Sequence, residues 1–337
     1  MEQNKVSFLD PKTGEPLSQQ EIDEMFMRRC LQLAKNGRQN AKPNPMVGAV
    51  IVSSEGRIIG EGYHVRCGEG HAEVNAFASV RKEDEALLPE ATIYVSLEPC
   101  AHYGKTPPCA DLIVSKHVRR VVVGCVDPFA KVHGRGIAKI REAGIDVTVG
   151  VLEAECRALI RRFITVNTLQ RPYIILKWAQ SANHLIDNAF TPTALSTPFT
   201  QMLVHKLRSE CDAIVVGRTT YNRDHPHLDV RHWAGHTPLP IVLSHSVPEG
   251  LPTHWRCYHS IDEMLSQLQA EHRQALLVEG GAHLLQQFIN RGLYDEVRIE
   301  TAPTTFATGT VAPTLPADLK LKKQELWEEN IIETFVK

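Results

Sequence analysis

Short apolar segments typical of β-strands alternate with helix-like segments along most of this chain. Helices are also expected in the first half, beginning with a Ser18–Glu21 capping-box pattern and ending at Gly37. Strands that alternate with helices indicate an α/β domain built on crossover connections. The first half is therefore expected to hold strands at 47–52, 58–62, 92–97, 120–124 and 146–149, and helices at 18–36, 71–80, 109–115, 138–143 and 153–168.

The second half repeats this alternation without repeating the sequence. Its expected strands are 173–178, 213–217, 240–243, 275–279 and 296–300, and its expected helices are 200–207 and 282–290. The Gln170–Pro172 stretch interrupts the preceding helical pattern, because the residue before a proline is disfavoured in a helix. A chain of 337 residues is also long enough for two domains. We expect a polar lead-in at 1–18, one α/β domain at 19–168 and another at 172–337.

The composition excludes several classes of protein. Lys and Arg number 37 against 39 Asp and Glu, so the basic surplus that a non-specific nucleic-acid binder needs is absent. No apolar run approaches the ~20 residues that span a bilayer, and residues 1–20 lack the apolar core of a signal peptide. We therefore expect a cytoplasmic protein with no nucleic-acid or membrane partner. The eight cysteines are then expected to be thiols or metal ligands.

A zinc-site pattern lies in the first domain. His71 opens a predicted helix, Cys100 follows a predicted strand, and Cys109 opens the next helix. One imidazole and two thiolates leave a fourth position on zinc for water, which is the arrangement of a catalytic site. Zinc lowers the pKa of such a water towards ~7. Glu73 is not needed as a ligand, so it can carry protons between that water and a substrate. We predict one zinc ion per chain.

The same pattern matches the H-x-E…P-C-x-x-C signature of zinc deaminases, with one departure. Cys100 and Cys109 are nine positions apart, and the extra residues form a loop that includes His102 and Lys105. Lys105 is suited to contact an anion, or it is simply solvated. Asn44, in a Pro-Asn-Pro segment before the first strand, places an amide near the end of the sheet.

Four segments carry a resemblance to a known family: 42–52, 70–73, 97–109 and 127–136. They closely resemble the bifunctional deaminase–reductases of riboflavin biosynthesis. The resemblance implies a cytidine-deaminase-like αβα fold, a homodimer or homotetramer, and hydrolytic loss of the 2-amino group from 2,5-diamino-6-ribosylamino-4(3H)-pyrimidinone 5′-phosphate. It implies that Asn44, His102 and Lys105 contact this substrate. His133 stands where the family usually has alanine, and no role is expected for it.

The second half contains no G-x-G-x-x-G fingerprint of a Rossmann fold. Glycine turns follow two of its strands, at 216–220 and 278–282, and the helix after the second could hold a phosphate at its N-terminus. With segments 177–179, 203–208 and 224–231, these turns resemble the family's reductase domain, an α/β domain similar to dihydrofolate reductase. That resemblance implies NADPH-dependent hydride transfer to C1′ of the opened ribose. It assigns cofactor contacts to Gln180, Thr220, Asp224 and Gly281, and substrate contacts to Arg208, Leu228, Arg231 and Glu279.

This half also departs from the family pattern. Asn183-His184 replaces the usual Asp-Gly, so a side chain stands where the backbone can require a conformation open mainly to glycine. Pro240 and Ser244 replace an arginine and an aspartate, and His225 replaces the residue, commonly Asn or Asp, that precedes a proline.

Three alternatives follow beside the bifunctional enzyme that we expect. The reductase half could be a degenerate domain kept as a scaffold. The chain could be a nucleic-acid editing deaminase, which the balanced charge and the lack of an aromatic–basic stripe disfavour. It could also be a non-enzymatic zinc protein, which would leave Glu73 without a purpose.

Overall fold

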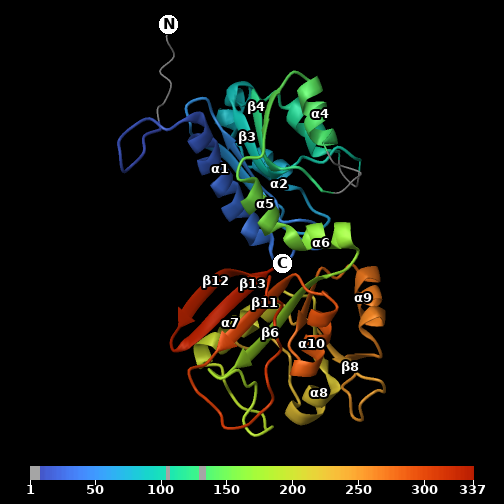
Figure 1. Ribbon diagram of the computed structural model, residues 1–337. Helices are drawn as coiled ribbons and strands as arrows, with labels where there is room; N and C mark the ends of the chain where they lie inside the picture. The colour runs from blue at the N-terminus through green and yellow to red at the C-terminus, as the bar shows by residue number, and fades with distance from the viewer. Residues whose placement is uncertain (1–7, 104–106, 129–133) are drawn as a thin grey trace. The chain divides into compact units, whose positions relative to one another are not determined.

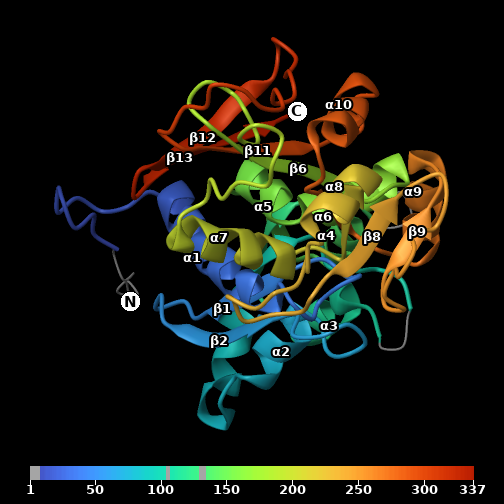
Figure 2. The ribbon, with the colours of Figure 1, turned by 90° about the horizontal axis from the view of Figure 1, so that it is seen from below.

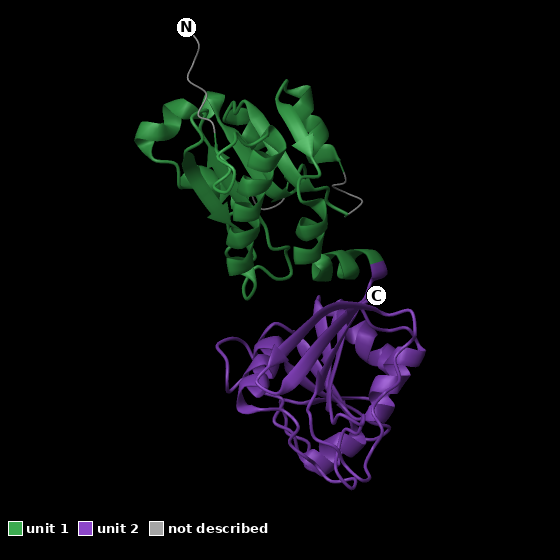
Figure 3. Ribbon diagram, turned by 60° about the vertical axis from the view of Figure 1, so that its left-hand side comes forward, with its two compact units in different colours: residues 1–168 green, residues 169–337 purple. Residues whose placement is uncertain are grey.

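The structure is a computed structural model that describes residues 8–103, 107–128 and 134–337. The chain divides into two compact units, residues 1–168 and 169–337, here called the N-terminal and C-terminal units (Figures 1 and 3). Lys105 and His133 lie outside the described residues. No helix within the described residues is both long and apolar enough to cross a membrane.

The N-terminal unit is built on a five-stranded sheet with the order β2-β1-β3-β4-β5. The hairpin partners β1 and β2 are antiparallel, as are β1 and β3, whereas β3, β4 and β5 are parallel. The strands are β1 (Gly48–Val52), β2 (Ile58–Tyr63), β3 (Thr92–Leu97), β4 (Arg120–Cys125) and β5 (Asp146–Val149).

Helices cover both faces of this sheet, because alternate residues of each buried strand point to opposite faces. On one face Ile51, Ile93 and Val121 pack with α2, α3 and α4. On the other face Val50 and Val122 pack with α1 and α5. This confirms the expected αβα layering. The helices are α1 (Gln19–Ala34), η1 (Lys35–Gly37), α2 (Ala72–Ala78), η2 (Lys82–Glu90), α3 (Cys109–Ser115), α4 (Arg135–Glu142), α5 (Glu153–Leu159) and α6 (Arg161–Leu169).

The single helix predicted over 153–168 is wrong, because two helices stand there. The backbone leaves helical geometry at Ile160, with φ −100° and ψ 15°. The Ile160 side chain is buried beside Cys156 in the core, so tertiary packing decides the chain's course at this point. By contrast, the predicted start of α1 is confirmed, with Ser18 and Glu21 forming both hydrogen bonds of the capping box.

The C-terminal unit is built on an eight-stranded sheet with the order β12-β13-β11-β6-β10-β7-β8-β9. Six strands, from β11 to β9 in this order, are parallel, and β13 and β12 extend the sheet with antiparallel pairings. Figure 2 shows β12, β13 and β11 in succession at this side of the sheet. The strands are β6 (Tyr173–Gln180), β7 (Ala213–Gly217), β8 (Leu239–Leu243), β9 (Arg256–Tyr258), β10 (Ala275–Val278), β11 (Glu296–Thr301), β12 (Lys320–Trp327) and β13 (Asn330–Val336).

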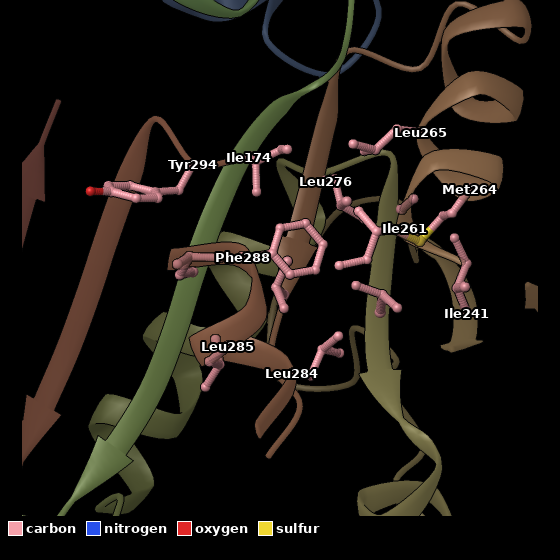
Figure 4. Packing of buried hydrophobic residues seen from close by; sticks show 14 of the residues in the cluster. Ile174, Ile241, Ile261, Met264, Leu265, Leu276, Leu284, Leu285, Phe288 and Tyr294 are labelled. Atoms are coloured by element: carbon pink, nitrogen blue, oxygen red, sulfur yellow. The ribbon is translucent and has the colours of Figure 1, made fainter. Parts of the chain in front are cut away.

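Four helices cover the two faces of this second sheet. On one face, α9 (Ile261–Ala270) and α10 (Ala282–Asn290) enclose the larger core. On the other face, α7 (Pro198–Ser209) and α8 (Arg218–Asp224) pack on a second cluster. The two cores pack against opposite faces of the parallel strands, and this packing fixes the positions of the strand ends. Figure 4 shows the larger core, with contributions from Ile174 of β6, Leu276 of β10, and Leu284, Leu285 and Phe288 of α10.

Candidate active sites

The three predicted metal ligands meet in the N-terminal unit. His71 is the residue before α2, Cys100 follows β3, and Cys109 is the first residue of α3. His71 Nδ1 lies 3.6 Å from Cys100 Sγ and 3.4 Å from Cys109 Sγ, and all three donor atoms lie within 4.8 Å of one another. A tetrahedral zinc ion with usual bond lengths separates its nitrogen and sulfur ligands by about 3.5 Å. The donor set therefore fits a single zinc ion.

The charge of Cys100 also suits a cation. Contacts with the Cys109 side chain, with His71 and with the Cys109 amide hold the pKa of Cys100 well below that of an ordinary thiol. The Cys109 amide donates to Cys100 Sγ over 3.2 Å. Because the thiolate is the form that binds metals, Cys100 is prepared for coordination.

Glu73 lies beside this donor set. Its carboxyl contacts the Cys109 side chain, and only 3% of the residue is exposed. Burial raises the pKa of Glu73 to about 7. A carboxyl group with this pKa both accepts and releases protons near neutral pH, which suits general acid–base catalysis.

Glycines in β2 hold α2, and with it His71 and Glu73, close to the sheet. A Cβ on Gly62 would lie 2.3 Å from the Ala76 nitrogen and 2.5 Å from the Ala72 oxygen, which are backbone atoms of α2. Only glycine allows this approach, so the helix rests directly on the strand.

The two predicted substrate residues that the structure describes in this unit, Asn44 and His102, have different surroundings. Asn44 Nδ2 lies 3.1 Å from His64 Nε2, and the His64 ring stands 5.4 Å from the His71 ring. Asn44 thus contacts His64, whose ring packs against that of the predicted ligand His71. His102 is exposed in the loop after Cys100.

Sequence reasoning missed two buried residues around this site. His64 is 2% exposed, and its one sequence signal is that it precedes His71 by seven positions. Glu98 is 4% exposed and accepts backbone N–H groups of Gly134 and Gly136, each at 2.9 Å. Since Glu98 stands two residues before Cys100, it ties the start of α4 to the ligand loop. Its position next to the Pro99-Cys100 pair was the available signal.

In the C-terminal unit, two cavities lie at the carboxyl ends of the parallel strands, where ligands of open α/β sheets usually bind. The smaller, of about 270 Å³, includes Lys177, Asp224 and Glu279 in its lining, and the larger, of about 660 Å³, extends past the ends of β7, β8 and β9. Both are lined by Thr220 and Gly281, and the Gly281 N–H donates to Thr220 Oγ1 over 3.0 Å. The two predicted glycine turns therefore meet between the cavities.

Two predicted substrate residues of this unit bind each other. Arg208 donates to both carboxylate oxygens of Glu279, at 2.6 and 3.1 Å, and its third nitrogen donates to the Asp229 carbonyl oxygen. Burial works to raise the pKa of Glu279, but the Arg208 charge outweighs it and leaves that pKa lowered. Glu279 is therefore an anion in the lining of the smaller cavity.

The other two predicted substrate residues are placed differently. Arg231 binds the Asp229 side chain over 2.5 Å. Leu228 is 2% exposed and packs in the core with Leu207 and Tyr221.

The structure accommodates the departure at Asn183-His184. His184 has φ +61°, in the left-handed region that favours glycine. Its Nδ1 lies 3.0 Å from Gln180 Nε2, while Trp178 Nε1–H donates to Gln180 Oε1. Asn183 hydrogen-bonds both backbone groups of Phe306. The substituted turn is thus strained at one residue and anchored by side chains on either side.

Comparisons with known proteins match each half of the chain to a protein family. Residues 20–125 match the model of the cytidine and deoxycytidylate deaminase zinc-binding region, and residues 172–335 match that of the RibD C-terminal domain. The riboflavin biosynthesis protein RibD of Aquifex aeolicus is 34% identical, with 94% of this chain and 98% of that protein covered. RibD of Bacillus amyloliquefaciens is 32% identical, with 87% and 88% covered.

Solved structures extend the likeness to the fold. The crystal structure of a diaminohydroxyphosphoribosylaminopyrimidine deaminase/5-amino-6-(5-phosphoribosylamino)uracil reductase from Thermotoga maritima has a TM-score of 0.87 and 32% identity, with 95% of this chain and 99% of that chain covered. RibD of Acinetobacter baumannii follows with a TM-score of 0.83 and 29% identity. The expected fold class, a deaminase domain followed by a reductase domain, is confirmed. The chain belongs to the RibD family of bifunctional deaminase–reductases of riboflavin biosynthesis.

Proposed function

We propose that the N-terminal unit removes the 2-amino group of 2,5-diamino-6-ribosylamino-4(3H)-pyrimidinone 5′-phosphate as ammonia, and that the C-terminal unit then reduces the ribosyl to the ribityl side chain with NADPH. The observation that carries the proposal is the donor set of His71, Cys100 and Cys109 with the buried Glu73 beside it. Each unit thus offers a candidate site for one half of the family's activity.

In the deaminase site, His71, Cys100 and Cys109 would hold zinc. Bound zinc supplies an acidified water as the nucleophile. Glu73 would accept one proton from the attacking water and pass it to the ring nitrogen, and it would then carry the second proton of that water to the amino group, which leaves as ammonia. A pKa of about 7 suits both transfers. Asn44 and His102 are the substrate-binding residues that the described part of the chain provides, and Lys105 is proposed as their companion.

In the reductase site, the larger cavity fits the adenosine end of NADPH. Its lining includes Arg218 and Arg291 and three histidines, and no aspartate or glutamate is found among its described residues. Ser244, which stands where the family usually has aspartate, accepts a hydrogen bond from Arg218. Arg291 is paired with Asp262, whereas Arg218 bonds to the neutral Ser244 and Ser246. Arg218 is therefore the cation proposed to favour the 2′-phosphate of NADPH over the hydroxyl of NADH.

The nicotinamide and the ribosyl group then belong in the smaller cavity. Thr220 and Gly281 are proposed to guide the cofactor between the two cavities, and Asp224 lines the smaller one. Gln180 lies on the same strand as Lys177 and is proposed as a further cofactor contact. Glu279, held by Arg208, would face the substrate, and Arg231 is the residue proposed to bind its phosphate.

The direct test supplies the purified, zinc-loaded protein with the diaminopyrimidine substrate. Ammonia release is expected without NADPH or NADH. Oxidation of NADPH is expected only after deamination, and NADH should be much less effective. Ammonia release with no NADPH oxidation would favour the deaminase with a scaffold domain. Release of ammonia from tRNA or single-stranded DNA would favour an editing deaminase, and no reaction would contradict the proposal.

The assembly and location of the enzyme are also proposals. We infer that it works as a homodimer or homotetramer in the cytoplasm, without a nucleic-acid or membrane partner. Light scattering of the purified protein and fractionation of cells test these two expectations.

A further inference from the structure

His64, directly after β2, connects the metal site with Asn44. Its Nδ1 lies 3.1 Å from the Gly70 carbonyl oxygen, and its Nε2 lies 3.1 Å from Asn44 Nδ2. Its ring stands nearly perpendicular to that of His71, at 86°. His64 is not a member of the metal donor set, and the deaminase chemistry proposed above does not use it.

The contacts of His64 determine where its proton lies. A carbonyl oxygen only accepts hydrogen bonds, so Nδ1 carries the hydrogen that faces Gly70. Gly70 is held from a second direction, since its oxygen also accepts from Asn75 Nδ2 over 3.1 Å. In a neutral imidazole, Nε2 is then an acceptor. His64 is buried, at 2% exposure, so these two contacts fix its ring.

The proton on His64 in turn determines how the Asn44 amide is oriented. An acceptor at Nε2 requires the NH₂ group of Asn44 on that side, so the amide oxygen Oδ1 points the other way. Within the described part of the chain, Oδ1 makes no hydrogen bond.

We propose that His64 is a positioning residue that holds Asn44 with its amide oxygen turned towards the substrate, as an acceptor for an N–H or amino group of the aminopyrimidine. This inference rests on the proposed deaminase function and adds the residue that sets how Asn44 recognises its substrate. A binding group fixed in advance costs less to order when the substrate arrives.

Two substitutions separate the contacts of His64. His64→Asn keeps a donor that can reach the Gly70 carbonyl but presents nothing to Asn44. His64→Gln can place its Oε1 near the position of Nε2 and so restore the acceptor for Asn44. We expect His64→Asn to lower kcat/KM for deamination about three- to tenfold, the effect of one neutral hydrogen bond, mainly through KM. We expect His64→Gln to recover most of this loss, with zinc content unchanged in both variants.

A double-mutant cycle decides whether the effect passes through Asn44. In an Asn44→Ala background, His64→Asn should cause little further loss, because the group that it orients is gone. His117→Asn is the matched control, since His117 is an exposed histidine of the same unit, and its activity should equal that of the wild type.

Two results would overturn the inference. Losses that multiply across the cycle would show that His64 acts independently of Asn44, and loss of zinc from His64→Asn would show that it acts on His71 instead. A wild-type protein that holds zinc but releases no ammonia would contradict the proposed function, which is a separate outcome.

Discussion

The surroundings of single residues set the properties of both units. In the N-terminal unit, burial moves the pKa of Glu73 to about 7, within reach of a proton-transfer role. In the C-terminal unit, the exposed His184 adopts a positive φ, and its ring contacts Gln180. Each residue can be tested by a substitution that changes one property and keeps the rest.

Replacing Glu73 by glutamine keeps the shape of the side chain and removes its acid–base function. We expect Glu73→Gln to retain zinc, because His71, Cys100 and Cys109 remain, and to lose deamination by at least ~10²-fold. Metal analysis and ammonia release measure the two effects. Glu69→Gln is the control, since Glu69 is an exposed acid near the same helix, and near-normal activity of Glu73→Gln would refute the role.

His184 allows a comparison of glycine with alanine at one position. In the left-handed region a residue with a Cβ pays about 1–2 kcal/mol, whereas glycine does not. Both His184→Gly and His184→Ala lose the contact with Gln180, so their difference isolates the backbone strain. We expect the glycine variant to be more stable by about 1 kcal/mol in denaturant unfolding of the C-terminal unit. An alanine variant of equal or greater stability would show that the positive φ carries no strain.

At the scale of elements, the sequence predicted best where the apolar pattern was local and continuous. The bounds of β3, β5, α3 and α10 are confirmed. Each is a short segment whose own sequence carries the pattern from which it was predicted. The strands β12 and β13 were missed, since β12 carries mostly exposed residues and owes its place to pairing with β13. Helices α8 and α9 were missed as well.

The metal site was predictable for a related reason. His71, Cys100 and Cys109 form a motif with fixed residue types, whereas His64 and Glu98 act through partners that the fold brings to them. No local pattern announces a histidine whose function is to orient a distant asparagine. The contacts that surround the metal ligands could therefore be identified only from the structure.

The turn after β10 gives a prediction for an element. A Cβ on Gly280 would lie 2.6 Å from backbone atoms of Val216 and Gly217 in β7, whereas a Cβ on Gly217 would meet only Leu284, at 3.7 Å. We expect Gly280→Ala to destabilise the C-terminal unit by roughly 1–3 kcal/mol, the scale of overpacking, and Gly217→Ala by less than about 1 kcal/mol. Urea unfolding measures both, and equal effects would contradict the close approach of the turn to β7.

At the scale of the whole molecule, each unit has its own sheet, its own cores and its own proposed ligand site. A ligand stabilises the folded state of the unit that binds it, by an amount that grows with its concentration above Kd. The sequence also provides a natural probe. All four tryptophans, Trp178, Trp233, Trp255 and Trp327, lie in the C-terminal unit.

Tryptophan fluorescence therefore follows unfolding of the C-terminal unit alone, while far-UV circular dichroism follows both units. NADPH at a hundredfold its Kd adds about 2.7 kcal/mol and should raise the fluorescence midpoint by roughly 5–10 °C. Removal of zinc by a chelator should lower the midpoint of the other transition and leave the fluorescence midpoint in place. In Cys100→Ser, which lacks one ligand, the chelator should have little effect on either midpoint, while NADPH should act as in the wild type.

If NADPH left the fluorescence midpoint unchanged, the C-terminal unit would be a scaffold. If each ligand moved both midpoints equally, the two units would unfold as one, and the assignment of separate sites to separately folding domains would fail.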